Sequence, residues 1–306
     1  MRIRSFRDLL AAARAATMPR VAVVRCAEGF VLRAAVAAYR HGVAEPILIG
    51  DTEAARRRAA ELGLDISPFE QVDADDDAAA LDAAIGMYKA SEAALLMKGL
   101  ISTATLLKAV LHKDKGVPPK GILSHVALFE RPGSGRLMAL TDAGVNIKPN
   151  LQRKAEIVRN AVSVLRALGV RTPRVAMLAA TEKVNFPAMP ATLDADLIAK
   201  MSAQGEFGPA LVAGPLQLDI AVSPRAARVK GYSHPVAGRA DILCVPDIES
   251  GNVLYKSLSS FSACDMAGIV AGSSVPMVVA SRGDSERSKL FSLALGTYLS
   301  RCPDIS

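Results

Sequence analysis

Three segments of the chain place polar and glycine residues directly after an apolar run, in patterns that could bind an anion. The first segment is LMKGLISTAT at 96–105, in which Lys98 supplies a positive charge. Ser102 and Thr103 stand where a helix is expected to begin, and a helix N-terminus offers free N–H groups to an oxyanion. The segment predicts an anion site, although an ordinary helix cap beside a solvated lysine explains the same residues equally well.

The second segment is ADILCVPDIESGNVLYK at 240–256, where an apolar strand ends at a proline and is followed by Asp247. The residues from Ser250 to Asn252 are expected to open the next helix. A carboxylate at a strand tip could accept a proton or a hydrogen bond during a reaction. It could also cap the helix that follows, and the sequence alone favours that role for Asp247.

The third segment is VVASRGDS at 278–285, in which a β-branched strand leads to Ser281 and Arg282 before a glycine turn. A guanidinium presents a rigid fork that matches phosphate, and a neighbouring hydroxyl adds a hydrogen bond. Arg282 could instead form a surface ion pair with Asp284 or Glu286. Both interpretations fit the spacing of these residues.

Apolar runs that alternate with helix-like stretches must position these three segments. The pattern predicts a mostly parallel β-sheet with helices on both faces, in which ligands bind at the carboxyl ends of the strands. The turn sequence RPGSGR at 131–136 departs from this pattern and predicts an antiparallel hairpin. The predicted strands are 20–26, 46–50, 93–97, 121–129, 137–140, 174–180, 210–213, 240–246 and 268–280, the last of these one long strand or a pair. The predicted helices are 28–41, 51–63, 75–90, 102–112, 151–168, 193–204, 252–262 and 285–300.

The composition of the 306-residue chain is that of a globular protein, with 51% hydrophobic and 22% charged residues. These values exclude a disordered chain, a collagen and a coiled coil. The longest apolar run, at 266–281, is interrupted by glycine and proline and is shorter than the roughly 20 residues of a membrane span, so we expect no membrane partner. The net charge of +7 favours small phosphorylated ligands, because the 4% aromatic content without tryptophan argues against a nucleic-acid partner.

The four cysteines show no CxxC pair and no histidine at metal-ligand spacing, so we expect no metal site and reduced thiols in a cytoplasmic protein. The arginine-rich residues 1–20 faintly resemble a transit peptide but lack the apolar core of a secretory signal, and we expect an amphipathic helix there. His125 lies inside a predicted strand, where a core position is the simpler interpretation. The motifs GxGxxG, GxxxxGK[ST], HExxH and GxSxG are absent from the sequence.

Five ordered blocks of sequence together resemble the phosphate acetyl/butyryltransferase family, which comprises phosphotransacetylases and phosphotransbutyrylases. The blocks are TDAGVNIKP (141–149), EKVNFPAMPATLDA (182–195), GPLQLDIAVS (214–223), HPVAGRADILCVPDIESGNVLYKSL (234–258) and SRGDSERSK (281–289). The resemblance implies a reversible reaction in which acyl-CoA and phosphate give acyl phosphate and CoA, with an acetyl or butyryl group. It implies no cofactor, because CoA is itself a substrate, and its partners are acyl-CoA, CoA, inorganic phosphate and acyl phosphate.

The same resemblance implies a two-domain α/β fold, a three-layer sandwich of the isocitrate/isopropylmalate dehydrogenase-like type, with the second domain inserted in the first. Mapped onto this sequence, the first domain comprises 1–128 and 269–306, and the second comprises 129–268. The active cleft is expected between them, in a homodimer or higher homo-oligomer. The turn at 131–136 independently suggests that the chain crosses between domains there.

The resemblance also assigns roles to individual residues. In acetyl-specialised members, the serine and arginine of the SRG block are implicated in CoA thiol contact and acyl-phosphate binding, and the matching residues here are Ser281 and Arg282. Asp284 and Asp247 are rival candidates for the base that accepts the thiol proton. The expected substrate-binding residues are Lys98, Ser102, Thr103, Asp142, Asn252 and Lys256.

Three positions depart from the acetyl-specialised pattern. Ser288 stands where those members have a carboxylate proposed to receive the thiol proton, Ser260 stands in place of an arginine, and Ala143 in place of a frequent cysteine. These departures resemble the butyryl or broad-chain members of the family. They leave the identity of the base open.

We expect direct acyl transfer in a ternary complex, because the sequence offers no convincing activated nucleophile for a covalent acyl-enzyme. Two other functions fit part of the pattern. A metal- and NAD(P)-dependent hydroxyacid dehydrogenase shares the implied fold, but its acidic ligand cluster and dinucleotide motif are not evident. A non-catalytic sensor of acyl phosphate or CoA is disfavoured by the retention of Ser281 and Arg282.

Overall fold

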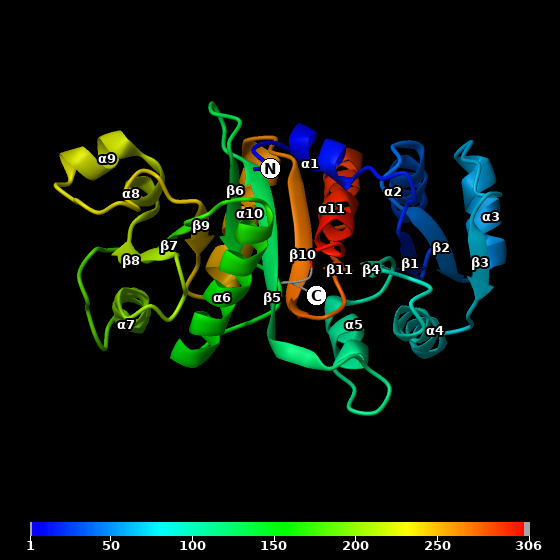
Figure 1. Ribbon diagram of the computed structural model, residues 1–306, viewed down its shortest axis with the longest axis horizontal. Coiled ribbons are helices and arrows are strands. Elements are labelled where there is room, and N and C mark those ends of the chain that lie inside the picture. The colour runs from blue at the N-terminus through cyan, green and yellow to red at the C-terminus, as the bar shows by residue number, and fades with distance from the viewer. Residues whose placement is uncertain (1, 303–306) are drawn as a thin grey trace. The chain divides into compact units, whose positions relative to one another are not determined.

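The computed structural model describes residues 2–302, which form two compact units (Figure 1). The first unit comprises residues 5–120 and 265–302, and the second unit comprises residues 2–4 and 121–264. The chain therefore leaves the first unit near residue 120 and returns to it near residue 265. The domain boundaries predicted from the family resemblance, at 128/129 and 268/269, stay a prediction.

The first unit contains a sheet whose strands follow the order β3-β2-β1-β4-β11-β10. Strands β3, β2, β1, β4 and β11 run parallel to one another. Strands β11 and β10 are antiparallel, so the apolar run at 268–280, which was predicted as one long strand or a pair, forms a pair. Met277 pairs with Leu96 and Val278 with Met97, so β11 lies directly beside β4. The strands are β1 (Arg20–Val24), β2 (Glu45–Gly50), β3 (Glu70–Asp73), β4 (Leu95–Lys98), β10 (Met266–Ser273) and β11 (Met277–Val278).

Within residues 2–302, five of the six helices of the first unit begin at a side-chain cap, and α2 is the exception. Asp51 and Asp76, for example, each accept a backbone N–H of the helix that follows, as expected for this residue type at a helix start. The helix predicted near the N-terminus is confirmed as α1, whose Phe6 ring stacks on Phe291 of α11 at 4.5 Å. The helices are α1 (Phe6–Ala13), α2 (Gly29–Arg40), α3 (Thr52–Glu61), α4 (Asp77–Lys89), α5 (Thr103–Val110) and α11 (Glu286–Leu299).

Helix α11 is buried along most of its length and packs against the sheet of its own unit. Gly296 permits this close approach, because a Cβ there would lie 2.6 Å from Val278 and 2.9 Å from Leu95. No helix within residues 2–302 is both long enough and apolar enough to cross a membrane.

The second unit contains a sheet with the strand order β5-β6-β9-β7-β8. Strands β5 and β6 are antiparallel and joined by the 131–136 turn, which confirms the predicted hairpin, whereas β6, β9, β7 and β8 run parallel. The strands are β5 (Pro119–Glu130), β6 (Leu137–Thr141), β7 (Arg174–Leu178), β8 (Leu211–Leu216) and β9 (Ile242–Cys244). The helices are α6 (Leu151–Ala167), α7 (Pro190–Ala203), α8 (Leu218–Val222), α9 (Pro224–Val229) and α10 (Ile248–Phe261).

Two helix starts differ from the predicted ones by three or more residues. Helix α10 begins at Ile248 rather than at residue 252, because the Asp247 side chain caps it. Gly251 thus lies inside the helix, at a point where a Cβ would come within 2.7 Å of a backbone oxygen of the 142–143 segment. Helix α7 begins at Pro190 rather than at residue 193, because a proline is favourable in the first helical turn.

The glycine that follows β4 is a steric requirement of the first unit. A Cβ at Gly99 would lie 2.3 Å from the carbonyl oxygen of Val24 and 2.4 Å from that of Arg25. Gly99 also donates its N–H to the Val24 oxygen at 2.8 Å, so the two backbones cannot separate without breaking this bond. The residue after Lys98 therefore has to be glycine for the end of β4 to lie against the end of β1.

We expect Gly99→Ala to lower the free energy of unfolding by roughly 1–3 kcal/mol, because the added methyl group forces the backbone apart. Urea-induced unfolding followed by circular dichroism measures the change. Gly86→Ala is the matched control, because a methyl group added there, inside α4, would meet no atom of a neighbouring segment within 4 Å among the described residues. Alanine at that helical position should raise the unfolding free energy by about 0.5–1 kcal/mol. Equal stabilities of the two variants would contradict the steric argument.

Candidate active site

Lys98 and Arg282 lie close together in the first unit, where two neighbouring parallel strands end. Lys98 is the last residue of β4, and Arg282 follows β11, whose Val278 pairs with the residue before Lys98. Burial lowers the pKa of the Lys98 ammonium, and the positive charge of Arg282 lowers it further. Two cations at the carboxyl edge of a parallel sheet form a site suited to an anion.

The ammonium of Lys98 is held over the loop that follows its strand. Its Nζ donates hydrogen bonds to the carbonyl oxygens of Gly99, at 3.3 Å, and Ile101, at 2.9 Å. These two carbonyls are its acceptors among residues 2–302, and a lysine ammonium has three N–H donors. One donor is therefore available to a ligand.

The turn 281–284 presents Arg282 to solvent. The carboxylate Oδ2 of Asp284 accepts the N–H of Ser281 at 2.7 Å, and the Asp284 N–H donates to the Ser281 oxygen at 3.1 Å. Glu286 pairs instead with Arg33 at 3.1 Å. Within the described part of the chain, Arg282 forms no ion pair, so the surface pair considered from the sequence is not formed.

Ser102 and Thr103 stand at the start of α5, as predicted. The Ser102 hydroxyl accepts the Thr105 N–H at 3.0 Å and lies 2.7 Å from the Thr105 hydroxyl, which confirms its role as a helix cap. Thr103 is the first residue of the helix and is half-buried. Ligand binding by these two residues stays a prediction.

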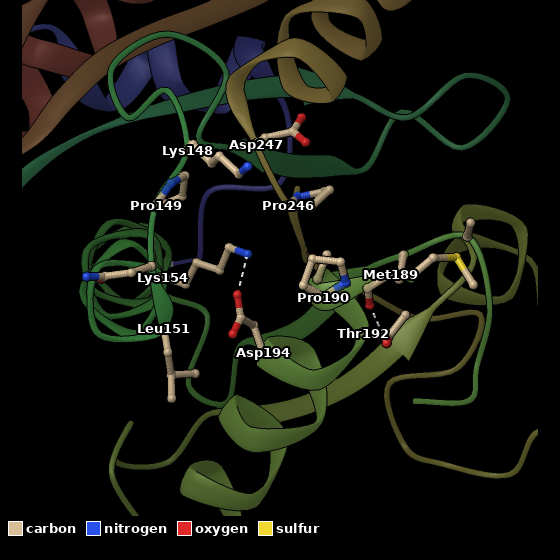
Figure 2. Close-up of a pocket in the computed structure, with 14 residues that line it drawn as sticks. Lys148, Pro149, Leu151, Lys154, Met189, Pro190, Thr192, Asp194, Pro246 and Asp247 are labelled. Atoms are coloured by element: carbon tan, nitrogen blue, oxygen red, sulfur yellow. Dashed lines mark hydrogen bonds and ion pairs between the residues drawn. The ribbon is translucent and has the colours of Figure 1, made fainter. Parts of the chain in front are cut away.

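The second unit contains a cavity of about 690 Å³ beside the carboxyl ends of β7 and β9. Its wall is largely apolar, with charged groups at separate points (Figure 2). Lys154 is 5% exposed, and its Nζ forms an ion pair with Asp194 at 2.8 Å. The lining residues are Lys148, Pro149, Asn150, Leu151, Lys154, Ala179, Ala180, Met189, Pro190, Ala191, Thr192, Asp194, Pro246 and Asp247.

Asp247 lines this cavity and also caps α10. Its Oδ1 accepts the Ser250 N–H at 2.9 Å and the Ser250 hydroxyl at 2.6 Å. The helix-cap interpretation of Asp247 is therefore confirmed. The side chain is half-buried and borders a cavity, so a second role as a proton acceptor is compatible with its position and stays a prediction.

Asp142 is buried, and its carboxylate is occupied by the loop that follows it. Oδ1 accepts the N–H groups of Gly144 and Val145, both at 2.9 Å. Oδ2 accepts the backbone N–H of Asn146 at 3.1 Å and its side-chain amide at 2.7 Å. These four bonds shape the 142–146 loop, so any contribution of Asp142 to substrate binding acts through the conformation of that loop.

Asn252 and Lys256 both lie on α10. Asn252 is exposed, whereas Lys256 is half-buried with its Nζ 5.2 Å from the Tyr255 ring centroid. The predicted site residues thus fall into two groups. The first unit holds Lys98, Ser102, Thr103, Ser281, Arg282 and Asp284, and the second unit holds Asp142, Asp247, Asn252 and Lys256.

Two buried lysines, Lys154 and Lys289, were missed by the sequence reasoning. The sequence feature that could have indicated a buried Lys289 was its position as a single cation between Ser288 and the apolar stretch that follows. Ser288 is itself buried, and its hydroxyl accepts the Met266 N–H at 2.9 Å, a structural contact inside the first unit. Among residues 2–302, no three His, Cys, Asp or Glu side chains lie together as a metal ion would require. That the protein needs no metal stays a prediction.

Removing the charge of Arg282 should raise the pKa of Lys98. A nearby positive charge disfavours the protonated ammonium, so Arg282→Gln removes one of the two causes that lower this pKa. The value should still stay below the ordinary lysine range, because the burial is unchanged. NMR titration of reductively ¹³C-methylated lysines measures it, with Arg57→Gln, an exposed arginine of α3, as the control. An unchanged or lower Lys98 pKa in Arg282→Gln would contradict the proximity of the two cations.

Comparison with known proteins identifies close relatives over nearly the whole chain. A family model described as phosphate acetyl/butaryl transferase matches residues 78–297. The phosphate butyryltransferase of Clostridium acetobutylicum is 40% identical over 297 residues, which cover 97% of this chain and 98% of the relative. The phosphate acetyltransferase of Rhizobium meliloti is 38% identical over 287 residues, which cover 94% of this chain and 90% of the relative.

A solved structure supports the same relationship. The crystal structure of a branched-chain phosphotransacylase from Enterococcus faecalis V583 matches with a TM-score of 0.82 and 36% sequence identity, covering 93% of this chain and 99% of that one. This likeness confirms the predicted α/β fold class, which the mixed strand order and flanking helices of each unit also show. The chain belongs to the phosphate acetyl/butaryl transferase family and is an acyltransferase enzyme.

Proposed function

We propose that the chain transfers an acyl group reversibly between CoA and inorganic phosphate, and that the phosphate group binds at Lys98 and Arg282. The family establishes the class of reaction. The observation that supports the location is the pair of cations at the adjacent ends of β4 and β11, where Ser281 directly precedes Arg282 in the chain. Arg282 supplies a planar fork to two phosphate oxygens, and Lys98 adds a point charge.

In the direction of acyl-CoA synthesis, the CoA thiolate attacks the carbonyl carbon of the acyl phosphate. A carbon–sulfur bond forms, the bond between the carbonyl carbon and the phosphate oxygen breaks, and phosphate leaves with the electron pair. The cations at Lys98 and Arg282 stabilise the charge that accumulates on the leaving phosphate. Ser281 donates a hydrogen bond to the sulfur or to the tetrahedral oxyanion.

Forming the thiolate at neutral pH requires a modest stabilisation. A thiol with a pKa of about 8.5 needs a shift of about 1.5 units, which corresponds to about 2 kcal/mol. Hydrogen bonds to charged groups contribute about 1.5–3 kcal/mol each. A cation together with the Ser281 hydroxyl is therefore sufficient, and a carboxylate is needed only to accept the proton.

Direct transfer in a ternary complex is the simplest route. Burial raises the pKa of the Cys26 thiol to about 11 and that of Cys244 to about 12, so both stay protonated and are poor nucleophiles. No cofactor has to be held by the protein, since CoA enters and leaves as a substrate. We further propose that the acyl group is acetyl or butyryl, and that the enzyme works in the cytoplasm as a homodimer or higher homo-oligomer.

Arg282→Ala should lower kcat/KM for acyl phosphate by a factor of at least about 100, because it removes a preorganised cation from the leaving phosphate. A thiol-reagent assay with acyl-CoA and phosphate, together with the reverse assay, measures the effect. Arg57→Ala is the control, since it removes an exposed arginine of α3 that pairs with Glu53 on its own helix. Near-normal activity of a folded Arg282→Ala protein would remove Arg282 from the site.

Asp284 is the candidate base that lies in the same turn as Ser281, so we expect Asp284→Asn to remove the acidic limb of the pH–rate profile. A general base acts in its deprotonated form, so removal of the carboxylate should remove the rise of the rate with pH on the acidic side. The asparagine oxygen can still accept the Ser281 N–H, which preserves the turn.

Asp247→Asn is the matched comparison, because asparagine caps helices as well as aspartate does. We expect it to keep both the rate and the pH profile. If only Asp247→Asn lost the acidic limb of the pH–rate profile, Asp247 rather than Asp284 would be the base. No change in either variant would show that both assignments are wrong.

A further inference from the structure

Lys289 is a buried cation beside the 281–284 turn. It lies on the first turn of α11, and its side chain is 2% exposed. A charged side chain is rarely buried to this degree without a partner carboxylate in contact. Within residues 2–302, however, Lys289 forms no ion pair, and its ammonium is directed at the main chain of the turn instead.

The ammonium of Lys289 binds the turn at two points. Its Nζ donates to the carbonyl oxygen of Arg282 at 3.3 Å and also to that of Asp284. It lies 5.2 Å from the ring centroid of Phe30 on α2. Burial is the main cause that lowers the pKa of Lys289, and the negative charges of Asp284 and Glu286 partly oppose this effect.

A lysine at this position costs stability that an apolar residue would not. The next residues of α11, Leu290 and Phe291, are buried hydrophobic side chains, so an apolar residue at 289 would fit the surroundings without desolvating a charge. At position 289 the ammonium binds two carbonyl oxygens of the turn, those of Arg282 and Asp284. The energetic cost thus indicates a role in fixing the turn rather than in stabilising the helix.

We infer that Lys289 is a positioning residue that holds Arg282 in place for the phosphate group, an inference that rests on the proposed phosphate-binding role of Arg282. The N–H of Ser281 is fixed by the Asp284 carboxylate, whereas the carbonyl of Arg282 is fixed by Lys289. The turn is held on both sides of the residue that meets the phosphate. Displacement of a binding group by about 1 Å can cost about 100-fold in rate.

The test replaces Lys289 by methionine, which keeps the length of the side chain and removes the ammonium. We expect the KM for inorganic phosphate to rise about 10-fold or more, with a much smaller change in the KM for acyl-CoA. The thermal midpoint should stay the same or rise, because no charge is buried any longer. Lys289→Arg, which keeps N–H donors, should recover part of the phosphate affinity. A purely structural role would instead lower the midpoint and alter both KM values together.

Lys89→Met is the matched control. Lys89 is a lysine at the end of α4 in the same unit, and its Nζ also donates to a backbone carbonyl, that of Lys115 at 2.8 Å, but it is exposed. This variant should keep the parent KM for phosphate. A rise equal to that of Lys289→Met would show that loss of any such hydrogen bond produces the effect, and would overturn the inference.

The double variant Lys289→Met/Arg282→Ala separates the inference from the function on which it rests. If Lys289 acts through Arg282, its removal should have almost no further effect once Arg282 is absent. Full additivity, or a normal phosphate KM in a folded Lys289→Met protein beside an impaired Arg282→Ala, would overturn the inference alone. Activity retained in Arg282→Ala would instead overturn the proposed phosphate site. If Lys289→Met does not fold, Lys289→Gln and Lys289→Arg provide the same comparison of KM values.

Discussion

The central physical constraint of this structure is the mutual repulsion of Lys98 and Arg282, two positive charges held near one another in the first unit. Free in solution, two such side chains would separate, and only the surrounding fold keeps them near. Parallel pairing of β4 with β11 brings their main chains together. Carbonyl oxygens of Gly99 and Ile101 then restrain the ammonium. An anion bound between the two cations would relieve this repulsion.

Much of the architecture follows from local patterns in the sequence. The alternation of apolar runs with amphipathic stretches predicted most strands and helices, and the RPGSGR turn predicted the reversal of direction between β5 and β6. Strand β3 was missed because its residues, EQVD, are mostly polar and have no apolar periodicity. The short helices α8 and α9 were missed because each spans fewer than two turns, too short for a helical period to be recognised.

The candidate site was predictable only in part. The sequence favoured the helix cap at Asp247 and offered one at Ser102 beside an anion site, and both caps form, since capping depends on a few adjacent residues. Spacing could not reveal that Asp142 commits its whole carboxylate to one loop, nor that Lys154 and Lys289 are buried. Those properties depend on which distant segments pack around a side chain. A lysine in a helical sequence has the same pattern whether it faces water or the core.

Gly296 determines how closely α11 packs on the sheet, and the opposite end of the same helix carries Lys289. Its missing methyl group lets the helix approach Val278 and Leu95, on the strands that lead to Arg282 and Lys98. The first turn of that helix supplies Lys289, and a helix is stiff over this length. An alanine at 296 would require the Val278 and Leu95 side chains, or the helix itself, to shift. The packing of Gly296 against these strands is therefore linked, through the helix, to the position of the Lys289 ammonium that binds the 281–284 turn.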